Sequence, residues 1–207
     1  MLAELEAKQK ALVAEQDRLN KLKKDLEASS TRLAELEKMM ADKDAAMKKL
    51  KETLSKSLKA FEGKGLTVTE RDGKVYVSME NKLLFESGSW TVGAEGKKAV
   101  DLVGKVLGDN PDISVLIEGH TDNDKITGSI GGGVENNWDL STKRATAIVN
   151  ILSANAKVKK ENLTAAGRGE YAPLMSNETA EGKAKNRRIE IILTPKLDEI
   201  SKMLNEL

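Results

Sequence analysis

Hydrophobic residues recur every seven positions through the first third of the chain. The series runs without interruption from Leu5 to Phe61, at positions 5, 12, 19, 26, 33, 40, 47, 54 and 61. Residues 1–62 contain no Gly or Pro and consist mostly of strong helix formers. A heptad repeat on a continuous helix is typical of a coiled coil. The pattern therefore predicts a long helix over residues 1–62, with one apolar seam.

The second seam position of the same heptads is mostly polar. It is apolar only at Leu22, Leu36 and Leu50. Polar seam residues set the register of a coiled coil and lower its stability, so we expect a weak coiled coil with a second copy or a partner protein. The alternative is a single solvated helix, held by charge pairs such as Glu6–Lys10 that stabilise by only ~0.2–0.5 kcal/mol each.

The period of the pattern changes at Gly63-Lys64-Gly65. Apolar and polar residues then alternate over 66–70 and 75–79, around the turn Arg71-Asp72-Gly73-Lys74, which predicts a β-hairpin. Further on, the pattern predicts amphipathic helices at 95–107 and 138–154, strands at 113–117, 163–167 and 187–193, and a small C-terminal helix. We expect the strand at 113–117 to be buried on both faces. This mixture predicts an α+β fold with helices on one face of a mixed sheet.

Four segments follow from these patterns. We expect a helical coiled-coil stalk at 1–62, a linker and the start of the hairpin at 63–74, a globular domain at 75–195 and a C-terminal helix at 196–207. All of the glycines and prolines lie at or beyond Gly63. The change in composition therefore coincides with the predicted end of the stalk.

Charge and composition exclude several classes of protein. The 34 basic and 33 acidic residues leave a net charge of +1, with +3 over residues 1–65 and −2 over the remainder, so no nucleic-acid partner is expected. The chain has no Cys, which excludes disulfides, thiolate zinc sites and thiol nucleophiles. The longest apolar run is the four residues 11–14, far short of the roughly 20 residues that span a bilayer.

A charged residue interrupts the apolar stripe of the helix predicted at 138–154. At about 100° per residue, Arg144 falls in the same stripe as Leu140, Ala147, Ile148 and Ile151. A buried guanidinium requires an anion close by. The nearest candidate is Asp122, which follows the strand predicted at 113–117, and residues just beyond a strand's carboxyl end often bind ligands.

Two interpretations of Asp122 and Arg144 stay open. In the first, the two side chains form a structural ion pair without a ligand. In the second, a ligand separates them, with its ammonium on the carboxylate and its carboxylate on the guanidinium. The second arrangement is complementary to a zwitterion, and thus to an amino-acid-like head group.

Four short blocks also occur in a particular order along residues 75–195. They are Gly119-His120-Thr121-Asp122, Asn137-x-x-Leu140-Ser141-x-x-Arg144-Ala145, Gly167-x-Gly169 and Asn186-Arg187-Arg188-Ile189-Glu190. Together they closely resemble the C-terminal domain family shared by OmpA, Pal and MotB. The resemblance implies a β-α-β-α-β-β sandwich that binds peptidoglycan non-covalently, through the free end of meso-diaminopimelate in the stem peptide.

The resemblance implies ligand-binding roles for five residues. Asp122 and Arg144 would hold the ammonium and the carboxylate of the diamino acid. Asn137 would hydrogen-bond the ligand from the start of the helix, and Arg188 with the backbone of Ile189 would close the site from the last strand. The structural alternatives are a helix-capping or loop role for Asn137 and a surface charge at the sheet edge for Arg188.

The segment between Asp122 and Asn137 departs from the family pattern. Residues 123–136 are longer than the usual linker and rich in glycine, so we expect them to reshape the rim of the pocket or to act as a lid. Trp138 lies beside the proposed site. Its position favours packing in the core over contact with a sugar or peptide.

Other chemistry has little support in the sequence. Residues 122–124 begin like a calcium-binding loop, but Ile126 and Thr127 occupy its fifth and sixth positions. A hydrolase built on Ser141 and His120 lacks a nucleophile-elbow sequence. We therefore expect no enzymatic activity, no cofactor and no metal.

The expected function is non-covalent anchoring of the cell envelope, either the outer membrane or an envelope complex, to its wall. The alternative is a coiled-coil scaffold or adaptor for envelope proteins, with the globular domain as a cap. The resemblance implies a periplasmic location and attachment by a lipid, a barrel or an inner-membrane helix. None of the three occurs in the chain, so we expect the outer-membrane or other anchor to lie upstream of Met1.

Overall fold

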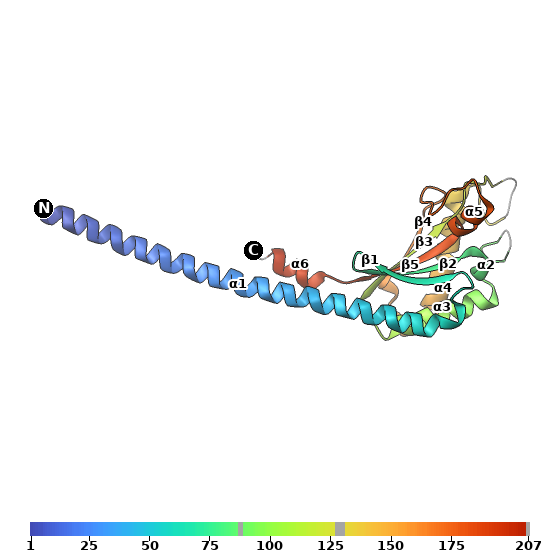
Figure 1. The fold of residues 1–207 in the computed structure, drawn as a ribbon, viewed down its shortest axis with the longest axis horizontal. Coiled ribbons are helices and arrows are strands. Elements are labelled where there is room, and N and C mark those ends of the chain that lie inside the picture. The colour runs from blue at the N-terminus through green and yellow to red at the C-terminus, as the bar shows by residue number, and fades with distance from the viewer. Residues whose placement is uncertain (87–88, 127–130, 206–207) are drawn as a thin grey trace. The chain divides into compact units, whose positions relative to one another are not determined.

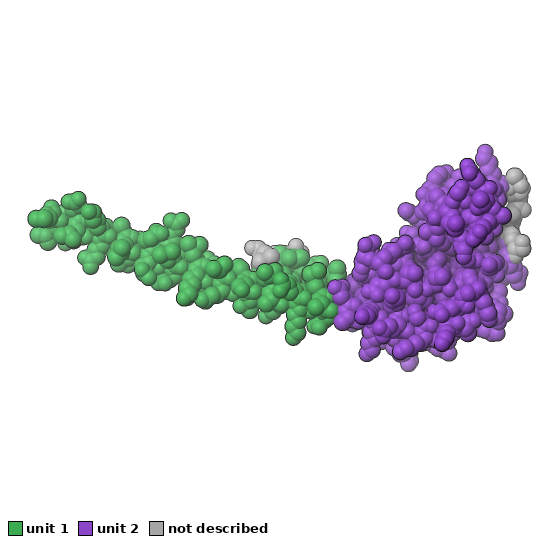
Figure 2. All heavy atoms as spheres, viewed as in Figure 1, with its two compact units in different colours: residues 1–43, 197–207 green, residues 44–196 purple. Residues whose placement is uncertain are grey.

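The computed structural model describes residues 1–86, 89–126 and 131–205 (Figure 1). Residues 127–130 of the expected glycine-rich lid lie outside the described residues. The chain divides into two compact units, coloured separately in Figure 2. We call residues 1–43 with 197–207 the helical unit and residues 44–196 the globular unit.

The predicted long helix is present as α1, Leu2–Leu58. Within the helical unit, the first seam position of every heptad is exposed to solvent, with exposed fractions between 53% and 73%, at Leu5, Leu12, Leu19, Leu26, Leu33 and Met40. The C-terminal helix α6, Asp198–Asn205, belongs to the same unit and buries Ile200. In the described part of the chain, no helix has the length and apolarity needed to cross a membrane.

The last turns of α1 belong to the globular unit. Met47, Leu50, Leu54 and Leu58 are buried in its core, together with Phe61 of the short 3-10 helix η1, Lys59–Phe61. The sequence places the junction between stalk and domain at residue 62. In the structure, the last four turns of the helix already serve as a core element of the globular unit.

A five-stranded mixed sheet organises the globular unit. The strands are β1 (Leu66–Arg71), β2 (Lys74–Glu80), β3 (Ile113–His120), β4 (Leu163–Gly167) and β5 (Arg188–Pro195), in the order β1-β2-β5-β3-β4. The predicted hairpin is β1 and β2, β3 and β4 are parallel, and β5 is antiparallel to both β2 and β3. With α3 (Ala94–Gly108) and α4 (Asn137–Ser153), the chain from β2 to β5 runs β-α-β-α-β-β. The predicted α+β class and topology are confirmed.

One face of this sheet carries the core. On β3, Ile113, Val115 and Ile117 are buried in the same cluster as residues of α1, α3 and α4, whereas Leu116 between them is only half-buried. The prediction that this strand is buried on both faces is therefore wrong. An apolar residue at an outward position does not by itself bring a second layer onto the sheet.

Close packing of α4 on β3 brings the start of the helix to the end of the strand. A Cβ atom at Gly119 would lie 2.0 Å from the backbone oxygen of Ser141, so only glycine fits there. Three short helices complete the unit: α2 (Asn81–Leu84), η2 (Lys160–Asn162) and α5 (Ala180–Asn186). This packing places Asp122, beyond β3, near the first turns of α4.

Candidate ligand-binding site

A cavity of about 630 Å³ opens where the ends of β2, β3 and β5 meet the start of α4. Segments far apart in the sequence contribute to it, because β5 lies between β2 and β3 in the sheet. The described lining residues are Glu80, Asn81, Lys82, Phe85, Thr121, Asp122, Asp124, Lys125, Ile126, Asn137, Leu140, Arg144, Ala184 and Arg187. Three of the five sequence-predicted site residues, Asp122, Asn137 and Arg144, are therefore brought together.

Asp122 is buried at the base of this cavity and is already paired. Its Oδ2 atom accepts a hydrogen bond from Nη1 of Arg187, and its Oδ1 atom accepts one from the backbone N–H of Asp124 at 3.2 Å. Arg187 directly follows α5 and is half-exposed. The carboxylate is thus held in a fixed orientation by a cation that solvent can reach.

Arg144 is buried, as the apolar stripe of its helix predicts. Its Nε and Nη2 atoms donate to the carbonyl oxygen of Ser89 at 3.2 and 3.1 Å, and its Cζ lies 5.2 Å from the centroid of the Phe85 ring. Among the described residues, no carboxylate oxygen lies within 4 Å of its guanidinium nitrogens. Burial, aided by the charge of Arg187 and opposed by that of Asp122, lowers the pKa of Arg144 to about 10. It stays charged at neutral pH.

These contacts exclude the first of the two interpretations of Asp122 and Arg144, and the second stays a prediction. A direct structural ion pair between them is wrong, because the carboxylate pairs with Arg187 and the guanidinium of Arg144 binds a neutral carbonyl. Both charges still line the same cavity. The lining of this cavity thus contains both a buried carboxylate and a buried guanidinium that are not paired with each other.

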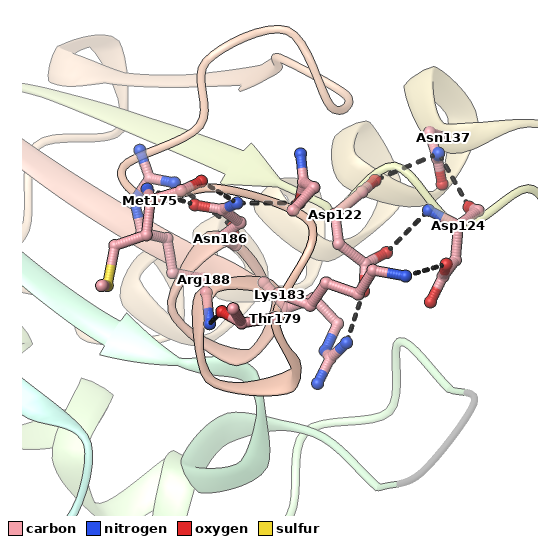
Figure 3. Close-up of polar contacts among 11 residues, drawn as sticks. Asp122, Asp124, Asn137, Met175, Thr179, Lys183, Asn186 and Arg188 are labelled. Atoms are coloured by element: carbon pink, nitrogen blue, oxygen red, sulfur yellow. Dashed lines mark hydrogen bonds and ion pairs between the residues drawn. The ribbon is translucent and has the colours of Figure 1, made fainter.

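Asn137 ties the loop after β3 to the start of α4 (Figure 3). Its Nδ2 atom donates to the carbonyl oxygens of Asp122 at 3.4 Å and Asp124 at 3.1 Å, and to Oε2 of Glu170 at 2.6 Å. The helix cap is the preceding residue, Asn136, whose Oδ1 accepts from the N–H groups of Trp138 and Asp139. The side chain of Asn137 therefore braces the wall of the cavity.

Arg188 and Ile189 occupy other places. Arg188 lies with Asn186 in Figure 3, donating to its carbonyl oxygen at 3.2 Å and to Oε1 of Glu190 at 3.0 Å, and it is not among the described residues that line the cavity. Ile189, whose backbone was expected to close the site, is likewise not among the described lining residues, and its side chain is buried in the core. Successive side chains of a strand point to opposite faces. Of the two adjacent arginines, Arg187, which directly precedes the strand, is the one that lines the cavity. The sequence signal that could have identified it was its position beside Arg188 in the same sequence block.

A second polar cluster lies on the face of the sheet opposite the core. Glu118, His120 and Glu190 have ligand atoms within 4.8 Å of one another, a set that could in principle hold a metal. Their carboxylates also contact Arg168, Arg71 and Arg188 at 3.0–3.9 Å, so these cations already offset the two acids. Burial, followed by the charges of Arg188 and Arg168, lowers the pKa of His120 to about 3. The imidazole is therefore neutral at physiological pH.

Comparison with known proteins identifies the fold and its family. Motility protein B of Bacillus subtilis (strain 168) is 36% identical over 120 residues, which cover 58% of this chain and 45% of the relative. Peptidoglycan-binding protein ArfA of Mycobacterium tuberculosis (strain H37Rv) is 42% identical over 83 residues, 40% of this chain and 23% of the relative. The structure of the cell wall anchor of the T6SS from Pseudomonas aeruginosa superposes with a TM-score of 0.61 at 28% identity, covering 69% of this chain and 97% of the other.

The matched region coincides with the cavity-bearing part of the globular unit. The chain spans less than half the length of these two curated relatives. The family model for the OmpA family matches residues 84–187, which hold β3, α4, β4 and α5 and most of the residues that line the cavity. The chain belongs to the OmpA family.

Proposed function

We propose that the globular unit binds peptidoglycan non-covalently, through the free end of meso-diaminopimelate in the stem peptide. The observation that carries the proposal is that, among the described residues, no carboxylate pairs with the buried charge of Arg144. A buried guanidinium whose partners are a neutral carbonyl and an aromatic ring is unfavourable unless an anion binds to it. A ligand carboxylate would supply that anion.

Another residue of the cavity lining, Asp122, suits the ammonium of the same ligand. Asp122 provides a buried carboxylate whose orientation is fixed by the N–H of Asp124. In this proposal the ammonium competes with Arg187 for Asp122, and the displaced Arg187 turns to the ligand carboxylate beside Arg144. Two arginines and one aspartate then complement the zwitterion. Arg187 takes the closing role that the sequence suggests for Arg188.

The relatives support a binding role without turnover. One relative is named a peptidoglycan-binding protein and a similar structure is described as a cell wall anchor. The cavity joins opposite charges rather than a nucleophile and a base, and the imidazole of His120 lies on the far face of the sheet. We place the protein in the cell envelope, where it would hold its partners to the wall.

The sharpest test removes one charge from the ligand and, separately, one charge from the protein at the proposed contact. Titration calorimetry should compare a stem tripeptide that ends in meso-diaminopimelate with one that ends in lysine, which lacks the distal carboxylate. We expect the wild type to prefer the first peptide by roughly tenfold or more, the range of a charge-assisted pair. Arg144→Gln should clearly reduce this preference, since the ligand carboxylate then loses the buried one of its two arginines.

Two controls separate binding from folding. Arg168→Gln removes an arginine outside the cavity and should leave the preference intact. Thermal unfolding should show that every variant remains folded. Unchanged discrimination by Arg144→Gln would reject the proposal, and so would pelleting of Asp122→Asn with diaminopimelate-containing sacculi as efficiently as the wild type.

A second candidate function concerns the helical unit. Its exposed heptad seam is the surface expected of a coiled coil that awaits a partner helix. We propose that residues 1–43 associate with a second copy or with an envelope protein and set the spacing of the wall-binding unit. A chain beginning at Asp44 should bind single stem peptides as the full chain does, but pellet less with sacculi if association provides avidity.

A further inference from the structure

Trp138 and Tyr171 form an exposed pair of stacked rings. Their side chains come from the start of α4 and from the loop after β4, and their centroids lie 5.3 Å apart with planes inclined by 24°. The exposed fraction is 49% for Trp138 and 68% for Tyr171. The expectation that Trp138 packs in the core is therefore wrong. Exposed aromatic surface beside a polar cavity is typical of binding sites.

The loop that carries Tyr171 is fixed to the same elements as the cavity. Gly169 adopts a left-handed backbone with a φ of 54°, and an added Cβ would lie 3.5–3.6 Å from both rings. Its carbonyl oxygen accepts from the N–H of Thr121 at 2.9 Å, and its own N–H donates to Oγ of Ser141 at 3.1 Å. The ring pair is thus held in place before any ligand binds, which lowers the entropy lost on binding.

A second hollow of about 280 Å³ lies against the rings. Its described lining residues are Lys125, Ile126, Glu135, Asn136, Asn137, Trp138, Glu170 and Tyr171. Three of these, Lys125, Ile126 and Asn137, also line the main cavity, and Asn137 donates to Glu170 across the boundary at 2.6 Å. A ligand in the main cavity can therefore continue into this hollow without leaving the surface.

We propose that the Trp138–Tyr171 pair is a platform for the glycan strand of peptidoglycan. A pyranose ring has an apolar C–H face that fits on an aromatic ring, and hydroxyl groups around its rim that donate to carboxylate and amide oxygens such as those of Glu135, Asn136 and Glu170. The inference rests on the proposed function, because the stem peptide in the main cavity brings its attached sugar to the hollow.

The charges that line the hollow favour its occupation by the sugar rather than by a further part of the stem peptide. Two carboxylates, Glu135 and Glu170, face the hollow against one cation, Lys125. The stem peptide is acidic and would be repelled by this pair. The sugar that bears the stem is uncharged once its lactyl carboxylate is converted into the amide that attaches the peptide. The platform thus adds affinity for a muropeptide that a free stem peptide lacks.

The test compares three ligands by titration calorimetry on the full chain: the disaccharide-tripeptide, the free tripeptide and the peptide-free disaccharide. We expect the wild type to bind the disaccharide-tripeptide about tenfold more tightly than the free tripeptide. Tyr171→Ala should reduce that ratio to about one without changing the affinity for the free tripeptide, and Tyr171→Phe should restore the ratio. The peptide-free disaccharide should bind weakly and in a Tyr171-dependent manner.

A matched control removes an exposed apolar side chain elsewhere. Leu174→Ala should leave all affinities unchanged, because Leu174 is exposed and does not line the hollow. Equal binding of the disaccharide-tripeptide and the free tripeptide by the wild type would overturn the platform alone. A ratio that survives in Tyr171→Ala would do the same. Failure of the wild type to bind either peptide would overturn the proposed function and the platform together.

Discussion

The two halves of the heptad seam on α1 have opposite environments. From Leu5 to Met40 the seam residues are exposed within the helical unit, whereas Met47, Leu54 and Phe61 of the same series are buried in the globular unit. The period and the residue types are continuous across this change. A heptad pattern therefore identifies which side of a helix requires cover, but it does not say whether that cover comes from the same chain or from another.

The difference has an energetic basis. The buried half removes large apolar side chains from water, at roughly 1.5–3 kcal/mol for each. In a single chain, the exposed half removes no comparable apolar surface from water. An isolated helix is stabilised mainly by interactions between residues close in sequence. The buried half should therefore affect folding of the globular unit, and the exposed half should affect association.

The largest effect is expected from the position of a truncation. A chain beginning at Asp44 keeps Met47, Leu50, Leu54 and Leu58 and should unfold at the temperature of the full chain. A chain beginning at Gly63 loses all four and Phe61, whose burial at roughly 1.5–3 kcal/mol each is comparable to the whole of the usual 5–15 kcal/mol of stability. We expect it to lack a cooperative transition by circular dichroism. Similar melting of both chains would show that α1 is dispensable for the core.

A pair of leucine substitutions sharpens the comparison within one helix. Leu54→Ala creates a cavity and should lower the free energy of unfolding by about 2–5 kcal/mol. Leu19→Ala removes an exposed side chain and should change it by about 0.5 kcal/mol or less. Urea unfolding followed by tryptophan fluorescence measures this, because both tryptophans, Trp90 and Trp138, lie in the globular unit. Equal effects would contradict the assignment of the two halves.

Acid should weaken the globular unit selectively, because it contains His120, the only histidine of the chain. The folded pKa of about 3 lies below the ordinary value of 6.5, so the unfolded state takes up a proton first as the pH falls. Above pH 6.5 the imidazole is neutral in both states, so protonation of His120 takes nothing from the free energy of unfolding. Between pH 6.5 and 3, protonation of the unfolded state lowers the free energy of unfolding by at most about 1.4 kcal/mol per pH unit. His120→Gln should have a shallower pH dependence of unfolding, and an identical slope would refute the role of burial.

The smallest effect on folding is expected from charges placed on the exposed seam. The double substitution Leu19→Asp with Leu26→Asp should leave unfolding of the globular unit within about 0.5 kcal/mol of the wild type. It should abolish concentration-dependent association in sedimentation equilibrium. Val13→Asp alters an exposed residue outside the seam and serves as the control. A wild type that is monomeric at all concentrations would exclude a second copy as the partner.

Much of the fold could be predicted from local patterns. The hairpin, the helices α3 and α4 and the succession of strands along the chain follow from periodicity and from turn residues such as Asp72-Gly73. The junction between stalk and domain could not be predicted from these patterns, because Met47 and Leu54 do not differ in the sequence from the other seam residues. Only their burial in the core cluster of the globular unit distinguishes them.

The candidate site shows the same division. Arg144 could be singled out because a charge in an apolar stripe is anomalous at the level of one helix. Its actual partner, the carbonyl of Ser89, lies 55 residues away and has no sequence signal. Arg187 and Arg188 are adjacent in sequence, and only the entry of the chain into β5 decides which one faces the cavity. Trp138 is exposed and stacks on Tyr171, which reaches it from a loop fixed by Gly169, a contact with no signal in the sequence around Trp138.

By itself the sequence determined the period of each segment, the glycines that permit turns and close approaches, and the charges that would be unfavourable if left unpaired. These properties depend on residues near in the chain, where backbone geometry sets the spacing. The tertiary structure alone decided which charges share a cavity, which half of the α1 seam is covered and where the aromatic pair lies. Those outcomes depend on long-range contacts, such as the pairing of β5 between β2 and β3, that no local pattern encodes.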